Sequence, residues 1–316
     1  MAHVPKNPNI AMRDGVSPSC LALPRVRQSP WPLLIDHLVE RLPRISRSEW
    51  VQRMQAGAVL GEDGKPLPVD APYMGGTRVY YWRELFDEAP IPFEATVLFE
   101  DEYLVVADKP HFLPVTPGGR YVRETLLVRL KAQLGHADLS PLHRIDRETA
   151  GLVLLCKRPQ DRDAYQSLFR DRRVEKVYEA IAPWQADRAF PLTRKSHMLE
   201  DEQAFYRMRE ATAQEGLSPN SETHIELLQP LGEHALYRLH PISGKRHQLR
   251  VHMNGLGLPI VGDQFYPTVK RGPQEAEDFA QPLQLLARSI AFTDPVTGQA
   301  RRFESARILT LQEIKQ

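Results

Sequence analysis

Three segments of this chain place ionisable side chains close together in ways that could support chemistry. The first, HRIDRETAGLVLL, sets Asp146 between Arg144 and Arg147 just before a continuous apolar run. A carboxylate beside arginines is stabilised in its ionised form, which makes it a poor acid but a usable nucleophile or general base. Because short motifs match freely, a structural ion pair at the entrance of a strand is the simpler explanation of this segment taken alone.

The other two segments add cations and an aromatic hydroxyl. In KVY, the alternation of a strand would put Lys176 and Tyr178 on the same face. In SGKRHQLRVH, a Ser-Gly turn precedes Lys245, Arg246 and Arg250. No single segment is specific, so the interpretation depends on all three occurring together.

Several other classes of site are excluded. The glycines of GLGLPIVGD lack the G-x-G-x-x-G spacing of a dinucleotide site, and no G-x-x-x-x-G-K-[ST] phosphate loop occurs. The eleven histidines form no H-E-x-x-H motif or Cys/His cluster, and the two cysteines, Cys20 and Cys156, are far apart. We therefore expect no metal site and no disulfide.

Composition limits the class of protein further. At 316 residues and 42% apolar content, the chain is expected to be globular, with about two domains. The formal net charge of +1 gives no overall attraction to a polyanion, so local basic patches would have to bind a nucleic acid. No stretch approaches the roughly 18 apolar residues of a membrane helix, and no secretory signal is evident. The sequence predicts a cytoplasmic protein without membrane association.

The N-terminal part of the sequence is predicted to form an arm and a small module. Residues 1–30 contain five prolines without sustained periodicity and are expected to form an extended arm. In residues 31–85, apolar spacing predicts a helix that Pro43 ends. The spacing of Ser46 and Glu49 predicts a capping box at the start of a second helix.

A linker at residues 86–93 is predicted to lead into a longer domain, residues 94–316. TVLF and YLVVA suggest a hairpin, and RETLLVRLKAQLG and QDRDAYQSLFRDR suggest helices. AGLVLLCK, VEKVYEAIA, THIELLQPL, HALYRLHP and QLRVHM read as strands. The small residues Thr149, Ala150 and Gly151 would let a backbone or a ligand approach closely. This mixture predicts an α+β domain.

Six segments in this order resemble the RluA-type family of RNA pseudouridine synthases. EDEYLVVADKP is similar to that family's opening hairpin, HRIDRETAGLVLL to its H-R-L-D-x-x-T-S/A-G segment, and KVYEA to its K-x-Y strand. SGKRHQLRVH, LPIVGDQFY and LLARSIAFTDPVTG resemble three further segments, and the match spans residues 93–305. The resemblance implies a pseudouridine-synthase fold, which is a mixed, mainly antiparallel sheet flanked by helices with a central cleft.

The resemblance also implies roles for particular residues. Asp146 would act on the glycosidic bond of a flipped-out uridine, and Arg250 would pair with Asp146 across the cleft. Tyr178 would stack on the base and assist proton removal from C5, and Arg144 would fill the space that the uridine vacates. No metal, nucleotide or redox cofactor is implied. The other cations expected to contact RNA in this domain are Lys176, Lys245 and Arg246.

Residues 31–85 resemble the RNA-binding module of the small-subunit ribosomal protein S-four, through RISRSEWVQRMQAGAVLGEDGKPL. Arg44, Arg47 and Arg53 lie in or beside its first two helices and are expected to contact phosphates. The expected partner is RNA, with large-subunit ribosomal RNA first and transfer RNA second. No obligate protein partner is inferred.

Lys245 and Arg246 replace the Arg-Thr pair that is usual in the family, whereas Asp146, Tyr178 and Arg250 are retained. The departures therefore bear on the choice of RNA rather than on the reaction.

Two other functions stay open at this point. One is a non-catalytic RNA-binding or ribosome-assembly protein that uses the same cleft, and the other is a hydrolase that cleaves the same bond and releases uracil. The set of Asp146, Tyr178 and Arg250 favours the isomerase, since a pure RNA binder has no need of an anion among its cations.

Overall fold

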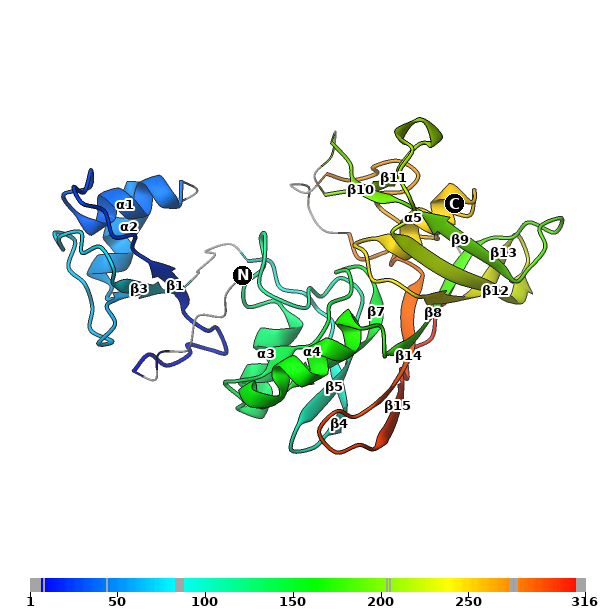
Figure 1. Ribbon diagram of the computed structural model, residues 1–316, viewed down its shortest axis with the longest axis horizontal. Coiled ribbons are helices and arrows are strands. Elements are labelled where there is room, and N and C mark those ends of the chain that lie inside the picture. The colour runs from blue at the N-terminus through cyan, green and yellow to red at the C-terminus, as the bar shows by residue number, and fades with distance from the viewer. Residues whose placement is uncertain are drawn as a thin grey trace. The chain divides into compact units, whose positions relative to one another are not determined.

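The chain forms two compact units in a computed structural model (Figure 1). The structure describes residue 7 and residues 9–43, 45–82, 88–202, 204, 206–272, 275 and 278–310. The first unit comprises residues 1–88, 118–123 and 128–137, and the second comprises residues 89–117, 124–127 and 138–316. The two later segments of the first unit were not expected from the sequence, which placed everything after residue 93 in one domain.

The first unit contains a small antiparallel sheet against which two helices pack. The strands follow the order β1 (Ser19–Ala22), β3 (Arg78–Tyr81) and β2 (Val59–Leu60). The helices are α1 (Leu34–Arg41) and α2 (Arg47–Gln55). Leu38, Trp50 and Val59 have no exposed surface and share one apolar cluster, so each element contributes to the same core.

Helix α2 begins with the predicted capping box. The Ser46 hydroxyl accepts a hydrogen bond from the Glu49 backbone N–H at 3.3 Å, and the Glu49 carboxylate accepts one from the Ser46 N–H at 2.8 Å. Such a cap stabilises a helix by about 1 kcal/mol. The backbone at Gly57 has φ +67°, which lets the chain leave the helix there.

Two expectations for the N-terminal part need correction or lie outside the description. Residues 1–30 are not only an extended arm, because Ser19–Ala22 forms the edge strand β1 paired with β3. Pro18 and Pro24 flank this four-residue strand, which is too short to show a period, and proline is tolerated beside an edge strand. The predicted linker, residues 86–93, lies partly outside the described residues, and residues 88–93 contain neither helix nor strand.

The second unit is built on a ten-stranded mixed sheet. Its order is β4-β5-β7-β14-β8-β13-β12-β9, with β6 beside β7 and β15 beside β14. Only β7 and β14 are parallel, and the other pairs are antiparallel. The strands are β4 (Thr96–Glu100), β5 (Leu104–Lys109), β6 (Ser140–Pro141), β7 (Ala150–Cys156), β8 (Glu175–Pro183), β9 (Leu192–Ser196), β12 (Ser221–Leu231), β13 (His234–Pro241), β14 (Leu285–Thr293) and β15 (Ala300–Glu304). The predicted mixed, mainly antiparallel sheet is confirmed.

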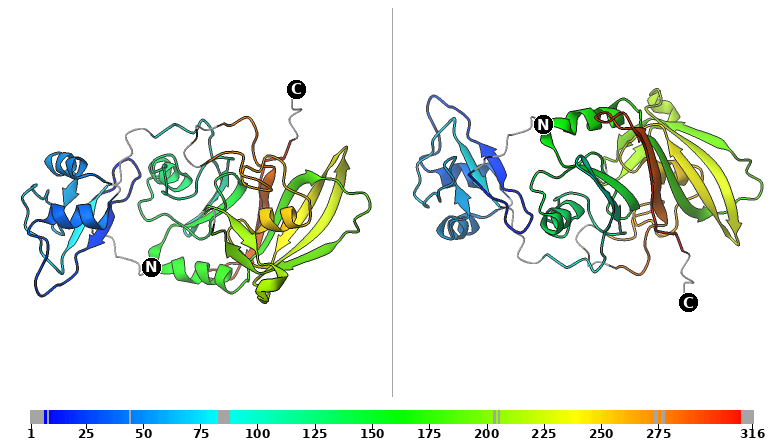
Figure 2. Two further views of the ribbon diagram at one scale, coloured as in Figure 1. Left: turned by 90° about the horizontal axis from the view of Figure 1, so that it is seen from above. Right: turned by 90° about the horizontal axis from the view of Figure 1, so that it is seen from below.

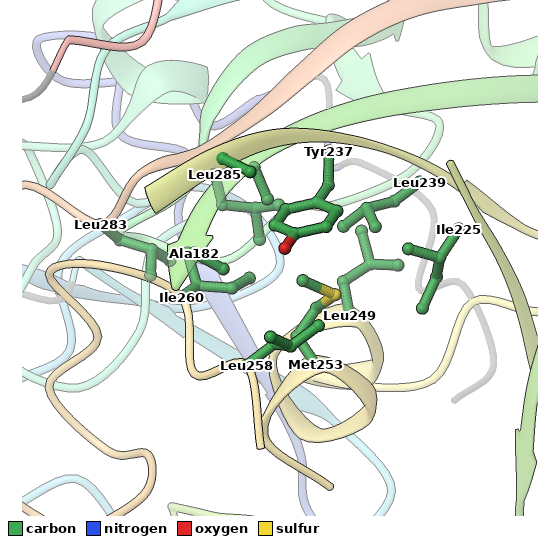
Figure 3. Packing of buried hydrophobic residues seen from close by; sticks show 12 residues of the cluster. Ala182, Ile225, Tyr237, Leu239, Leu249, Met253, Leu258, Ile260, Leu283 and Leu285 are labelled. Carbon is green, nitrogen blue, oxygen red and sulfur yellow. The ribbon is translucent and has the colours of Figure 1, made fainter. Parts of the chain in front are cut away.

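Short elements accompany this sheet. The hairpin β10 (Met198–Glu200) and β11 (Met208–Glu210) forms a separate two-stranded sheet in this unit, and α4 (Arg162–Arg170) occupies a predicted helical segment. The other predicted helix, α3 (Leu126–Leu134), belongs mostly to the first unit, which includes residues 128–137. Helix α5 (Gln248–Gly255) contacts β9, β12 and β13, and Figure 2 shows it beside these strands. Leu249 and Met253 of α5 pack against Tyr237 (Figure 3). Full burial of each such side chain contributes about 1.5–3 kcal/mol.

The segment QLRVHM was predicted to be a strand, and this prediction was wrong. It forms the first three quarters of α5, and all of its residues, Gln248–Met253, are buried. Because the helix is buried on almost every side, its apolar residues do not follow the one-sided helical spacing, and the alternation Leu249, Val251, Met253 imitates a strand.

Gly151 allows β7 to approach β14 closely in the middle of the sheet. Its φ is +108°, and a Cβ atom there would lie 2.3 Å from the Ala287 carbonyl oxygen on β14. Only glycine allows this approach, so the structure confirms the first of the two predicted alternatives for Thr149-Ala150-Gly151, the close approach of a backbone. The loop before β7 therefore leads into a strand that is paired with β14, which in turn is paired with β8.

Candidate active site

Asp146 lies in the loop between β6 and β7, and the end of β5 anchors that loop. The Asp146 carbonyl accepts a hydrogen bond from the Thr149 N–H at 3.2 Å, which closes a tight turn. The fully buried Lys109 ammonium donates to the Arg147 carbonyl at 3.0 Å, and a His111 ring nitrogen lies 2.7 Å from the Glu148 carbonyl. Burial lowers the pKa of Lys109 to about 7, although Glu148 and Asp146 oppose the change.

The histidine of the HRIDR segment, His143, has a structural role. His143 Nε2 accepts the Leu154 N–H at 3.1 Å, and its ring stacks on Phe169 with centroids 4.7 Å apart. Burial, with a smaller effect of Lys176, lowers the pKa of His143 to about 3, so the ring is neutral at pH 7. His143 therefore fixes the start of the loop to β7 and α4.

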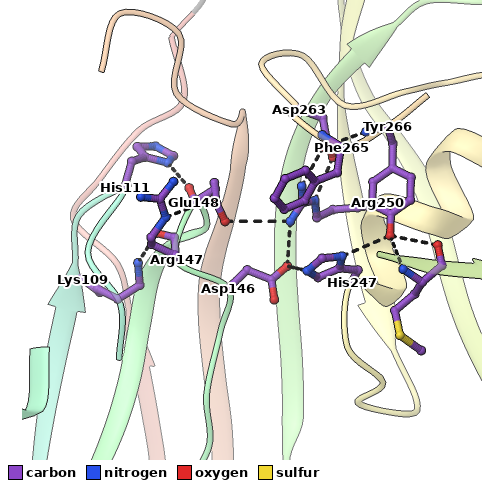
Figure 4. Close-up of polar contacts among 11 residues, drawn as sticks. Lys109, His111, Asp146, Arg147, Glu148, His247, Arg250, Asp263, Phe265 and Tyr266 are labelled. Carbon is purple, nitrogen blue, oxygen red and sulfur yellow. Dashed lines mark hydrogen bonds and ion pairs between the residues drawn. The ribbon is translucent and has the colours of Figure 1, made fainter. Parts of the chain in front are cut away.

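Arg250 is the centre of a buried ionic network (Figure 4). This residue comes from α5, and its side chain has no exposed surface. Its Nε and Nη2 atoms donate to Asp263 at 2.8 and 2.7 Å, and Nη1 donates to Asp146 at 3.2 Å. Glu148 lies 3.9 Å from the same Nη1 atom. These carboxylates raise the pKa of Arg250 despite the opposing effect of burial, so the guanidinium stays charged.

The sequence analysis did not identify Glu148 and Asp263. Both are almost fully buried, and Glu148 also accepts from Arg147 Nε at 2.9 Å. Burial would raise the pKa of Glu148, but Arg147 and Arg250 outweigh burial and lower it. Glu148 follows the RIDR run directly and Asp263 is the only acid in LPIVGDQFY, so both were visible in segments already singled out.

A hydrogen-bonded turn precedes α5 and fixes where the helix begins. Gln248 Oε1 accepts from the Ser243 hydroxyl at 2.7 Å and from the Lys245 N–H at 3.1 Å. Its amide nitrogen donates to the Glu222 carbonyl on β12 at 2.9 Å. The turn that carries the basic residues is therefore fixed to the sheet, and with it the first turn of the helix that holds Arg250.

Tyr178 and Lys176 extend from β8, as their alternation predicted. Tyr178 is half-buried, and burial together with the Asp146 charge raises its pKa, so its hydroxyl is protonated at neutral pH. Lys176 donates to the Ser243 carbonyl at 3.3 Å, and burial followed by Arg172 lowers its pKa. Lys176 therefore contacts the turn before α5 as well as lining the cleft.

A cleft of about 880 Å³ lies above these residues and is strongly cationic. Among the described residues that line it, Asp146 is the one carboxylate. Arg144, Arg172 and Lys245 are exposed there and have no ion-pair partner within the described part of the chain. The lining cations are Arg144, Arg147, Arg170, Arg172, Lys176, Lys245, Arg246 and Arg250, of which Arg147, Arg170 and Arg172 were not among the site residues predicted from the sequence.

Arg170 and Arg172 had no distinguishing signal in the sequence. They lie at and just after the end of α4, where charged residues usually form a solvated face. Arg246 also lines the cleft, but it already donates to the Arg207 carbonyl at 3.0 Å. A partly buried carboxylate surrounded by exposed cations is suited to a substrate whose backbone is anionic.

The arginines predicted to contact RNA from the N-terminal unit differ in accessibility. Arg47 is 55% exposed at its side chain but pairs with Asp36 at 2.7 Å. Arg53 is 7% exposed and packs against Trp50, which leaves it little access to a phosphate. Arg44 lies outside the described residues.

Neither a metal cluster nor a membrane helix is found in the described part of the chain. No group of three or more His, Cys, Asp or Glu side chains is arranged to hold a metal ion among those residues. No helix within the same ranges is long and apolar enough to cross a membrane.

Known proteins are similar to this chain in sequence and in fold. The model of the family described as RNA pseudouridylate synthase matches residues 103–255. An uncharacterized RNA pseudouridine synthase of Synechocystis sp. is 31% identical over 234 residues, which cover 74% of this chain and 79% of that protein. Ribosomal large subunit pseudouridine synthase D of Neisseria meningitidis is 26% identical over 281 residues, covering 85% of this chain and 74% of that one.

A solved structure supports the fold independently. Human RNA pseudouridylate synthase domain containing 1 superposes with a TM-score of 0.56 over 70% of this chain and 91% of that one, at 20% identity. The chain belongs to the RluA-type family of RNA pseudouridine synthases. It is an isomerase that acts on RNA.

Proposed function

We propose that Asp146 is the catalytic carboxylate with which this enzyme isomerises a flipped-out uridine in structured RNA. One observation carries the proposal: Asp146 is the one carboxylate among the described residues that line a cationic cleft, and Arg250 holds it there at 3.2 Å. The side chain of Asp146 is 23% exposed, so it is accessible from the cleft while its partner is fully enclosed. A carboxylate at the floor of a basic cleft can act on the sugar of a nucleotide whose flanking phosphates bind to the cationic rim.

The reaction rearranges bonds within one nucleotide. The N1–C1′ bond breaks, the uracil turns, and a C5–C1′ bond forms in its place. C5 loses a proton and N1 gains one, so substrate and product have the same composition. Asp146 acts at C1′ during cleavage and rejoining, and Tyr178 stacks on the detached base while its hydroxyl stays protonated.

The uridine must leave its stack before Asp146 can reach it. Arg144 is exposed at the cleft and fills the space that the base leaves. Arg172 and Lys245, also exposed at the cleft, contact the flanking phosphates. Unpaired or loop nucleotides cost less to extrude than paired ones, so the target lies in a loop or bulge.

Large-subunit ribosomal RNA is the first candidate substrate, with transfer RNA second. The name of the Neisseria meningitidis relative, which covers most of this chain, supports this order. The N-terminal unit would add affinity as a module like that of ribosomal protein S-four. Arg47, at the start of α2, is the described cation there that we propose to contact RNA.

Pseudouridine mapping by chemical labelling in cells with and without this gene tests the function. A site that disappears without the gene and returns with the wild-type gene, but not with Asp146→Asn, would support both the reaction and the role of Asp146. A site that Asp146→Asn restores would overturn the role of Asp146. The RNA that contains the site decides between ribosomal and transfer RNA.

A further inference from the structure

His247 lies between Asp146 and a second polar anchor, and the network around Arg250 leaves its role unexplained. The side chain is 9% exposed, and its Nε2 atom lies 3.9 Å from Asp146 Oδ2. Its Nδ1 atom lies 3.1 Å from the Tyr266 hydroxyl. The ring stacks on Phe265 with centroids 5.8 Å apart and an angle of 20° between the planes. Figure 4 shows the imidazole joining Asp146 to Tyr266.

The backbone of His247 is held in an uncommon conformation. Its φ is +55°, in the left-handed region, which costs a residue other than glycine about 1–2 kcal/mol. Such a conformation persists where surrounding contacts fix it, and it is found most often at functional sites. Here the His247 carbonyl accepts the Val251 N–H at 2.9 Å, and the Gln248 side chain fixes the preceding turn.

The Tyr266 hydroxyl is the polar partner of the other ring nitrogen of His247. The Tyr266 hydroxyl accepts the Met208 N–H at 2.8 Å, and its own proton can go to the Met208 carbonyl or to His247 Nδ1. Burial lowers the pKa of His247, so the ring is neutral at pH 7 and has one N–H. A proton on Nδ1 would turn the Nε2 lone pair toward a carboxylate. A proton on Nε2 is attracted to Asp146 and leaves Nδ1 to accept from Tyr266.

Arg250 approaches the same oxygen of Asp146. Its Nη1 atom lies 3.2 Å from Oδ2, whereas Oδ1 has no partner among the described residues. Arg250 Nη1 and His247 Nε2, from α5 and its N-terminal cap, therefore face the same carboxylate oxygen at 3.2 and 3.9 Å. A carboxylate held at one oxygen presents the other in a fixed direction, which favours attack at a single atom of the substrate.

We propose that His247 is a positioning residue for Asp146, in which Nε2–H attracts Oδ2 across 3.9 Å, the Tyr266 hydroxyl donates to Nδ1 and so favours that tautomer, and Oδ1 faces C1′ of the uridine. The proposal rests on the catalytic role proposed for Asp146. His247 neither bonds to the substrate nor exchanges a proton with it in this role.

Single-turnover kinetics with saturating enzyme test the role of His247. The probe is unmodified ribosomal and transfer RNA transcribed in vitro with tritium at uridine C5, because each new C5–C1′ bond releases one tritium. We expect His247→Ala to lower the rate about 30- to 100-fold through misplacement of Asp146, with RNA affinity within about twofold of wild type. His247→Gln should recover most of the rate, since its side-chain amide can donate to Oδ2.

Tyr266→Phe separates control of the tautomer from structural support. It should lower the rate about 3- to 10-fold in the wild type and cause no further loss in His247→Ala, as expected for residues that act through one contact. Equal losses in both backgrounds would overturn the part assigned to Tyr266. The exposed histidine of β12 provides the matched control, and His224→Ala should change neither rate nor affinity.

The experiments distinguish an error in the proposed function from an error in the role of His247. If Asp146→Asn releases tritium at the wild-type rate, the proposed function itself is wrong. If Asp146→Asn is inactive while His247→Ala keeps more than half of the wild-type rate, only the role of His247 is overturned. A large loss in His247→Ala that His247→Gln does not reduce would also contradict it, because the glutamine retains an N–H donor.

Discussion

Arg250 divides its guanidinium between Asp263 and Asp146. Two nitrogens donate to Asp263 at 2.7 and 2.8 Å, and the third donates to Asp146 at 3.2 Å. The bidentate pair fixes the plane of the guanidinium, so Asp146 is held by the nitrogen that remains. Asp263 does not line the cleft. Asp263, away from the substrate, therefore positions Asp146, the carboxylate that we propose to react.

Asp263→Asn should impair both stability and turnover. Loss of one partner from a buried ion pair costs about 3 kcal/mol of unfolding free energy, and Arg250 would be free to rotate away from Asp146. We expect the single-turnover rate to fall about 10- to 100-fold, as for other misplaced catalytic groups. Urea unfolding and the tritium-release rate measure the two effects.

A matched ion pair away from the cleft separates these effects. Asp101 pairs with Arg301 at 2.8 Å and lines no part of the cleft. Asp101→Asn should lower stability but leave the rate of the folded enzyme unchanged. A similar loss of rate in both variants would show that stability alone accounts for the effect of Asp263→Asn.

Arg172→Gln should weaken RNA binding without changing the chemical step. Arg172 is exposed at the cleft and has no ion-pair partner among the described residues. We expect the dissociation constant to rise about 3- to 10-fold, and the slope of log affinity against log salt to fall by about 1. Arg302→Gln on β15 is the control, since Arg302 is exposed but lies outside the cleft. An unchanged salt slope in Arg172→Gln would contradict a phosphate contact.

Lys109 should make stability rise with pH above neutrality. In the unfolded chain its pKa is 10.5, whereas burial lowers it to about 7 in the folded protein. Between these values the unfolded state binds up to one proton more, so the unfolding free energy increases with pH in that window. Lys109→Met removes this contribution.

Urea unfolding of both proteins at pH 7, 8, 9 and 10 measures the change. The wild-type curve should rise more steeply than that of Lys109→Met, by at most one proton's contribution. Parallel curves would mean that Lys109 stays charged in the folded protein. Lys109 also donates to the Arg147 carbonyl, so the variant should lose activity through the loop that carries Asp146.

Features that depend on neighbouring residues could be predicted from the sequence. The capping box of Ser46 and Glu49 is local, and the small segment at Gly151 matches its observed approach to β14. The strands β7, β8, β12 and β13 also agree with their apolar runs. In each case the pattern and the structure depend on residues a few positions apart.

Features that depend on tertiary burial could not be predicted in the same way. Helix α5 is buried on almost every side, so its alternation indicated a strand. The Arg250–Asp263 pair joins a helix to a loop whose course the sequence does not reveal, and Arg172 resembles any exposed arginine after a helix. Likewise, nothing in HRIDRE alone shows that Glu148 turns inward to the same guanidinium.

Tritium release by Asp146→Asn tests the central claim most directly. The asparagine is close in shape to the aspartate but carries no charge and cannot act as the reacting carboxylate. We expect no release above background from RNA labelled at uridine C5, with RNA affinity close to that of the wild type. Release at the wild-type rate would contradict the role of Asp146.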